Sequence, residues 1–239
     1  MVQIVQKIIE ERKLNYNKRT LIQLVKKYSK TDKESVHGYM SLYQEYFSPY
    51  QTKDIKLLEI GIQLGDSIRM WNDYFENGNI FGIDIDHVHM INENCFIIDA
   101  GKREDLKKLV DKCGKFDIII DDGSHNMVDH QISLGYLFKY LKLGGIYVIE
   151  DLLSQDYKSN PGPFNKFNKG HLYHRNWKYK EKKENNTLDM LKKIISDKVV
   201  ISEYMLDDEK KYLENNIKSI KLYDTKYKDN ICFIVKGDK

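Results

Sequence analysis

Residues 116–151 read FDIIIDDGSHNMVDHQISLGYLFKYLKLGGIYVIED, and this stretch decides the fold. It contains two apolar runs, 118–120 and 146–149, and each run ends in a pair of adjacent carboxylates. Short β-branched runs of this kind are typical of strands buried on both faces of a parallel sheet. In such a sheet, ligands bind outside the carboxyl ends of the strands, so both acidic pairs are expected to face one site.

The same alternation of strand and helix extends outward from this stretch. Strands are expected at LLEIG, NIFGIDID, CFIIDA, FDIII and GIYVIE, with helices between them, and two more strands at 217–222 and 231–235 are expected to close the sheet. One helix is expected over 127–141 and another over 187–195. This order predicts an α/β protein with a Rossmann-like, doubly wound and mostly parallel sheet.

The chain divides by pattern into two parts. Apolar residues recur at helical spacing over 3–28, so residues 1–52 are assigned to an N-terminal helical segment. Residues 53–239 are assigned to the Rossmann-like domain. Within it, the polar and aromatic residues 156–186 break the pattern and are expected to form a long loop or lid.

Composition narrows the class of protein. The 239 residues are 41% hydrophobic and 31% charged, enough to bury a substantial core. A net charge of +3 from 39 basic and 36 acidic residues gives no reason to expect a nucleic-acid partner. The three cysteines are widely separated, which fits a reducing compartment and neither a zinc cluster nor a disulfide framework. Without an apolar signal core or a run of roughly 18 apolar residues, the chain is expected in the cytoplasm and without a membrane partner.

The first three predicted strands end in residues suited to a nucleoside. In LLEIGIQLGDS (57–67), Glu59, Gly61 and Gly65 lie where a strand gives way to a helix whose first N–H groups are free. Asp84 and Asp99 end the next two strands, where they could accept hydrogen bonds from ribose hydroxyls and from an adenine amine. The spacing misses the GxGxxG fingerprint, so a chance arrangement of loop acids is the alternative.

The two acidic pairs point to a metal and proton-transfer site. Asp121 and Asp122 follow one buried run, Glu150 and Asp151 follow the other, and His125 comes three residues after Asp122. Carboxylates at neighbouring strand ends make an oxygen-rich site suited to a hard divalent cation. The alternative is that these acids cap helices or turns, which is the commoner role of an isolated acid at a strand end.

Together these motifs resemble a known family. LEIG with GDSIRMW, GIDID, IIIDDGSH and GGIYVIEDL are similar to class I S-adenosylmethionine-dependent methyltransferases, specifically the metal-dependent sugar O-methyltransferases of macrolide and aminocoumarin tailoring (mycinamicin, macrocin and novobiocin type). TDKESVHGYMSLYQEYF is similar to the segment before the first strand in that family, so the resemblance covers about 31–237. It implies a seven-stranded sheet with the last strand antiparallel, and methyl transfer to a hydroxyl of a sugar or a glycosylated metabolite.

The resemblance also implies roles for individual residues. Asp122, Glu150 and Asp151 match the ligands of Mg²⁺ (or Mn²⁺ or Ca²⁺), and His125 matches the general base. The cofactor-binding positions, for S-adenosylmethionine, are Glu59, Gly61, Ser67, Asp84, Asp99 and Asp121. His37 and Tyr39 match the family's pre-strand segment and either close over the cofactor or serve in packing. His87, His89 and His130 are expected on solvated faces.

The sequence leaves several alternatives open. The acceptor could be a non-sugar oxygen, in a catechol or a capsule phosphoramidate, or the chain could be a relative of cephalosporin hydroxylases or a non-catalytic cofactor-binding subunit. The expected partner is a small sugar or nucleotide sugar. The N-terminal helices are expected to pack on the main domain or on a second copy of the chain in a homo-oligomer.

Overall fold

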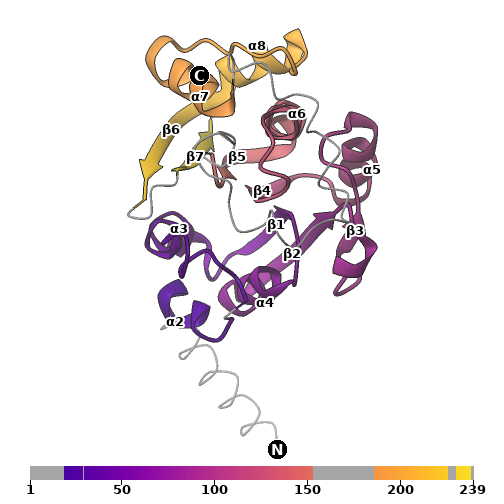
Figure 1. Ribbon diagram of the computed structural model, residues 1–239, viewed down its shortest axis with the longest axis vertical. Coiled ribbons are helices and arrows are strands. Elements are labelled where there is room, and N and C mark those ends of the chain that lie inside the picture. The colour runs from indigo at the N-terminus through magenta and orange to yellow at the C-terminus, as the bar shows by residue number, and fades with distance from the viewer. Residues whose placement is uncertain (1–18, 29, 153–185, 226–229, 238–239) are drawn as a thin grey trace, which may run out of the picture.

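The computed structural model describes residues 19–28, 30–152, 186–225 and 230–237 (Figure 1). They form one seven-stranded sheet in the order β3-β2-β1-β4-β5-β7-β6. The strands are β1 (Asp54–Ile60), β2 (Asn77–Asp84), β3 (Cys95–Ile97), β4 (Phe116–Asp121), β5 (Leu141–Ile149), β6 (Ile217–Asp224) and β7 (Asn230–Lys236). The neighbours among β1 to β5 pair in parallel, and β7 runs antiparallel to both β5 and β6. The expected Rossmann-like sheet with an antiparallel last strand is confirmed.

Helices cover both faces of this sheet. They are α2 (Leu21–Val25), α3 (Met40–Phe47), α4 (Asp66–Tyr74), α5 (Arg103–Cys113), α6 (Met127–Leu137), α7 (Thr187–Asp197) and α8 (Asp207–Asn216), with 3₁₀ turns η1 (Ser48–Tyr50), η2 (His87–His89) and η3 (Phe138–Tyr140). In Figure 1, α2, α3 and α4 lie on one side of the sheet and α5 to α8 on the other. Side chains alternate between the two faces of a strand. Ile118 and Ile120 therefore enter the core shared with α2 to α4, while Ile119 enters the core shared with α5 to α8.

Residues 19–52 pack directly on the sheet. Met40, Tyr43 and Phe47 of α3 recur on one helix face, are buried, and share a core with α4 and the central strands. This packing places the short segment between α2 and α3 against the carboxyl ends of the strands. Residues 1–18 of the predicted N-terminal helices lie outside the described residues.

One predicted helix is too long, one helix was not predicted, and the predicted lid falls almost wholly outside the described residues. The helix expected over 127–141 ends at Leu137, because η3 and then β5 follow at once, and Lys236 Nζ donates to the carbonyl oxygens of Phe138 and Leu141 there. Helix α8 was not expected, because its sequence DDEKKYLENN carries only one buried apolar residue, Leu213. The predicted lid lies outside the described residues except for Asn186, whose side chain caps α7 by accepting from Asp189 N.

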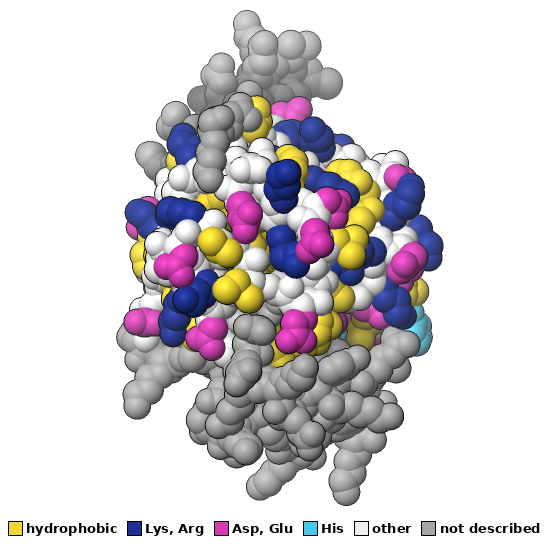
Figure 2. All heavy atoms as spheres, turned by 90° about the horizontal axis from the view of Figure 1, so that it is seen from above, with side chains coloured by type: hydrophobic (Ala, Val, Ile, Leu, Met, Phe, Trp, Pro, Cys, Tyr) yellow, Lys and Arg dark blue, Asp and Glu magenta, His cyan; other side chains and the backbone are white. Residues whose placement is uncertain are grey.

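Charges of both signs are mixed on the face over α7 and α8 (Figure 2). Ion pairs between residues three or four positions apart, such as Lys193 with Asp197 and Lys210 with Asp207, account for part of this mixture. Such pairs are typical of a solvated helix surface and contribute little to stability. Among the residues that the structure describes, no helix combines the length and the apolar character needed to cross a membrane.

Candidate functional site

The carboxyl ends of β1, β4 and β5 meet closely. Asp122 N donates to Ile60 O, and Glu150 N donates to Asp121 O, each at 3.0 Å. Gly61 makes this approach feasible, because a Cβ there would lie 2.1 Å from Asp122 O and its φ is +90°. Only glycine fits such a position without strain. The predicted cofactor turn and the predicted metal-binding loop are therefore packed against each other.

Asp122, His125 and Asp151 form a group that could hold a metal ion. One ligand atom from each lies within 4.8 Å of the others. His125 Nε2 is 3.9 Å from Asp122 Oδ1 and 3.6 Å from Asp151 Oδ2. His125 and Asp151 both have left-handed backbones, with φ of 52° and 54°. Such conformations cost energy in residues other than glycine and are concentrated at functional sites.

His125 lies at the open side of this group. Its side chain is 31% exposed, whereas the Asp151 side chain is 12% exposed. Nε2 faces the carboxylates, and within the described part of the chain the buried Nδ1 has no hydrogen-bond partner. An imidazole placed this way can act as a metal ligand or as a proton acceptor.

Glu150 faces a buried lysine. Lys33 is 1% exposed, and its Nζ lies 2.5 Å from Glu150 Oε1 and 2.6 Å from Asp122 Oδ2. Tyr43 OH donates to the same Glu150 oxygen. Burial alone would lower the pKa of Lys33, but Asp122, Glu150 and Glu59 together raise that pKa well above its ordinary value. Lys33 is therefore a fixed positive charge inside the acidic site.

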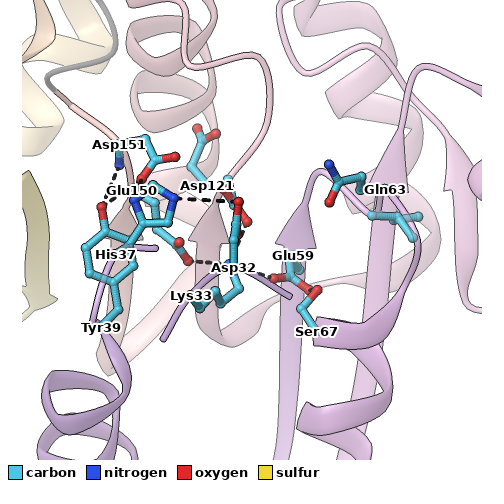
Figure 3. Close-up of polar contacts among 12 residues, drawn as sticks. Asp32, Lys33, His37, Tyr39, Glu59, Gln63, Ser67, Asp121, Glu150 and Asp151 are labelled. Atoms are coloured by element: carbon cyan, nitrogen blue, oxygen red, sulfur yellow. Dashed lines mark hydrogen bonds and ion pairs between the residues drawn. The ribbon is translucent and has the colours of Figure 1, made fainter. Parts of the chain in front are cut away.

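Two further side chains before β1 contact Asp151 (Figure 3). Tyr39 OH donates to Asp151 Oδ1 at 2.7 Å, and His37 Nδ1 lies 3.2 Å from the same oxygen. His37 Nε2 lies 3.6 Å from Asp32 Oδ2, and its ring stacks on Tyr39 with centroids 5.1 Å apart. The structure thus places His37 and Tyr39 beside a predicted metal ligand.

The predicted cofactor residues Glu59 and Ser67 contact each other. Glu59 is fully buried, its Oε2 accepts from Ser67 Oγ at 2.8 Å, and its Oε1 lies 3.3 Å from Lys33 Nζ. Burial raises the pKa of Glu59, and the charge of Lys33 opposes this shift. Lys33 therefore touches the ends of β1, β4 and β5 at once.

Asp84 and Asp99 lie at the next two strand ends of the same edge. Asp84 Oδ2 accepts from the backbone N–H groups of Ile62 at 2.9 Å and Gln63 at 3.2 Å, so it orders the turn after β1. Asp99 Oδ1 accepts from Gly101 N at 3.1 Å. The structure brings both acids to the edge that carries Glu59, as the sequence predicts, and both already support loop backbones.

Asp121 points away from this edge into the core beneath α6. Its Oδ2 accepts from Tyr147 OH at 3.2 Å and from Ser133 Oγ, and burial raises its pKa to about 6. His130 Nε2 lies 3.7 Å from Asp121 Oδ1. The solvated position expected for His130 is wrong, because the side chain is fully buried, and burial lowers its pKa to about 3. His89 is also largely covered, and His87 is exposed as expected.

Sequence reasoning missed Lys33 and Tyr43. Both come before the first strand, and their contacts with Glu150 span 117 and 107 residues. The available signal was the position of both residues in the TDKESVHGYMSLYQEYF segment, from which only His37 and Tyr39 were selected.

Comparisons with known proteins find curated relatives that match about half of the chain. Demethylmacrocin O-methyltransferase of Streptomyces fradiae is 35% identical over 145 residues, which are 56% of this chain and 37% of that protein. The 8-demethyl-8-alpha-L-rhamnosyl tetracenomycin-C 2'-O-methyltransferase of Streptomyces olivaceus is 32% identical over 144 residues, which are 56% of this chain and 38% of that protein. No protein-family model matches the chain.

A solved structure matches most of the described fold. The MycE methyltransferase of the mycinamycin biosynthetic pathway, in complex with Mg and SAH, has a TM-score of 0.70 and 27% sequence identity, covering 92% of this chain and 55% of that one. The chain thus spans about half of MycE, and the matched stretches are little more than a third of the two curated relatives. The resemblance to class I methyltransferases, and within them to sugar O-methyltransferases of macrolide pathways, is confirmed.

Proposed function

We propose that this chain is an S-adenosylmethionine-dependent O-methyltransferase that requires a divalent cation and modifies a hydroxyl of a sugar or a glycosylated metabolite. The observation that carries the proposal is the convergence of Asp122, His125 and Asp151 within 4.8 Å, beside the strand end that bears Glu59. Relatives named as O-methyltransferases and the match to MycE with Mg and SAH support it.

The donor atoms fit a hard divalent cation. Asp122, Glu150 and Asp151 would hold Mg²⁺, or Mn²⁺ or Ca²⁺, because carboxylate oxygens are the ligands that these ions prefer. Among the described residues, Asp122 and Asp151 each bring a ligand atom into the group within 4.8 Å. Glu150 is not in that group, since its Oε1 contacts Lys33, and it would have to use its other oxygen to reach the ion. When bound, the cation supplies Lewis acidity that favours deprotonation of a nearby hydroxyl, and the cofactor supplies a sulfonium methyl group.

The chain's own residues would position the reactants and accept a proton. His125, exposed at the mouth of the site, would take the proton of the acceptor hydroxyl at Nε2 as general base. Glu59, Ser67 and the turn fixed by Asp84 would bind the cofactor beside it, with Asp99 one strand further along the edge. Asp121 would support this turn region from the core rather than by direct contact.

The proposal also covers the acceptor and the N-terminal segment. The acceptor would be a small sugar, a nucleotide sugar or a glycosylated metabolite in the cytoplasm. The described part of the N-terminal segment would contribute to the site as well as to packing or self-association, because Lys33, His37, Tyr39 and Tyr43 all contact its acids.

The test is methyl transfer with a panel of acceptors. Purified protein is incubated with S-adenosylmethionine and Mg²⁺ and with nucleotide sugars, glycosylated macrolides or catechols, and products are read by mass spectrometry. Gain of one methyl group on a sugar, abolished by chelator, is the expected result. Methylation of a catechol alone would overturn the acceptor class, and SAH binding without transfer to any acceptor would favour a non-catalytic subunit.

A further inference from the structure

Lys33 occupies an unusual place in the site. It comes from the irregular segment between α2 and α3, yet its ammonium lies among three carboxylates from three different strand ends (Figure 3). The distances from Nζ are 2.5 Å to Glu150, 2.6 Å to Asp122 and 3.3 Å to Glu59. All three carboxylates would repel one another without a cation between them.

Lys33 contacts residues of both proposed binding sites at the carboxyl edge of the sheet, the one for the methyl donor and the one for the cation. Glu59, near the end of β1, belongs to the half proposed to bind the methyl donor, whereas Asp122 and Glu150, directly after β4 and β5, belong to the half proposed to bind the divalent cation. Tyr43 OH donates to the same Glu150 oxygen that Lys33 contacts, and Ser67 Oγ donates to the Glu59 oxygen that Lys33 does not contact. The side chain of Lys33 therefore links the acids of the two halves directly, in addition to the backbone contact between Asp122 and Ile60.

We propose that Lys33 is a positioning residue that sets the spacing between the donor-binding and cation-binding halves of the site. This inference rests on the proposed function and adds a specific role for a residue outside the strand ends. Its ammonium holds Asp122 and Glu150 in the orientation that the cation requires, and it holds Glu59 toward the cofactor. Loss of Lys33 would release both halves together.

Charge and positioning make opposite predictions for cation affinity. If Lys33 acted only as a nearby positive charge, its removal would make the site more negative and would tighten cation binding. If Lys33 positions the ligands, its removal lets the carboxylates move apart and weakens cation binding. The sign of the change in affinity therefore distinguishes the two roles.

The experiment compares Lys33→Met, Lys33→Arg and a matched control, Lys27→Met. Lys27 also pairs with an acid, Asp73, but its side chain is 64% exposed. Mn²⁺ affinity and coordination are read by electron paramagnetic resonance, SAH affinity by calorimetry and folding by circular dichroism. Lys33→Arg keeps the charge, but its planar guanidinium cannot reproduce contacts made by a compact ammonium.

We expect Lys33→Met to bind both Mn²⁺ and SAH at least about tenfold more weakly, the scale of losing a residue that orients metal ligands. Lys33→Arg should weaken both by a smaller factor and alter the Mn²⁺ spectrum, and Lys27→Met should match the wild type. Tighter Mn²⁺ binding by Lys33→Met, unchanged affinities, or an effect on only one ligand would overturn the proposal.

Two other outcomes are informative. If Lys33→Met does not fold, Lys33→Arg carries the test, and failure of both to fold would assign Lys33 to stability alone and overturn the proposal. If the wild type binds neither SAH nor Mn²⁺, the proposed function itself is wrong. The Lys33 variants test the inference only if the wild-type protein binds both SAH and Mn²⁺.

Discussion

The strand ends and the segment before β1 contribute different chemistry to the same site. The ends of β1, β4 and β5 supply acids, whereas the 33–43 segment supplies an ammonium, an imidazole and phenol hydroxyls that contact them. Acids that follow apolar runs are visible in a sequence because the strand pattern fixes their place. Their partners are not, because only the folded chain brings the 33–43 segment to that edge.

The largest expected effect comes from removing a strand-end acid. Asp122→Ala deletes a proposed cation ligand and leaves Lys33 without one of its partners, so Mn²⁺ affinity should fall on the order of a hundredfold or more. Methyl transfer should fall with it. Calorimetry with Mn²⁺ and the acceptor assay measure both, with Asp111→Ala as the control because that acid is 61% exposed in a helix ion pair. Full activity of Asp122→Ala in excess chelator would exclude a role for Asp122.

His125→Gln tests the proposed general base, which lies in the loop after β4. If His125 is the general base, the chemical step should slow by about 10² to 10⁴ while SAH and Mn²⁺ affinities stay close to wild type. Single-turnover kinetics and calorimetry separate these readouts, and His87→Gln, at a side chain that is 79% exposed, is the control. Loss of Mn²⁺ binding instead would identify His125 as a ligand in place of Glu150.

Tyr39→Phe and Tyr43→Phe compare two hydroxyls of the 33–43 segment. Tyr39 OH donates to Asp151 and Tyr43 OH donates to Glu150. If both acids bind the cation, each variant should weaken Mn²⁺ binding by about tenfold, because each removes a hydrogen bond that orients a ligand. Paramagnetic resonance gives the affinities. Weaker Mn²⁺ binding by Tyr39→Phe but not by Tyr43→Phe would mean that Asp151 is a cation ligand, whereas Glu150 only pairs with Lys33.

His130, in the core beneath α6, is expected to affect folding stability and not ligand binding. Its folded-state pKa is lowered to about 3 by burial, so below its ordinary value of 6.5 only the unfolded chain gains the proton. The contribution of His130 to folding stability should therefore fall as pH drops from 6.5 toward 3, by up to about 1.4 kcal/mol per pH unit. Asp121 acts in the opposite direction, since its pKa is raised to about 6 and protonation as pH falls favours the folded state.

His130→Gln should remove the His130 contribution, so that below pH 6.5 the variant loses less stability, or gains more, than the wild type as pH drops, and Mn²⁺ binding should stay unchanged. Urea unfolding at pH 7, 6, 5 and 4 measures the slope for wild type and variant. Equal slopes would mean that His130 is protonated in the folded state, against its complete burial.

The fold was predictable to a large extent from the sequence. The Ile118–Ile120 run, the strand-ending acids and the helices between them follow from hydrophobic periodicity, which depends on neighbours in the chain. Helix α8 was missed because ten mostly charged residues carry almost no apolar pattern. The end of α6 was misplaced because Lys236, which caps that region, lies 95 residues from Leu141.

The site was predictable only in part. The positions of Asp122, Glu150, Asp151 and His125 at one edge follow from parallel strands ending together. Asp121 and Asp122 are neighbours in sequence, yet the alternation of side chains along β4 sends Asp121 into the core. The role of Lys33 could not be read from its neighbours, because a lysine among Thr31, Asp32 and Glu34 has the composition of a solvated turn.

The central claim is that a divalent cation and the methyl donor bind side by side at the carboxyl edge of this sheet. A crystal structure of the protein with Mn²⁺ and SAH, with the ion located by anomalous scattering, tests it most directly. The account predicts a peak within about 2.0 to 2.6 Å of carboxylate oxygens of Asp122 and Asp151, the range for such hard cations, with SAH against the turn that bears Glu59 and Gly61. An ion elsewhere, or SAH bound away from that turn, would contradict the account.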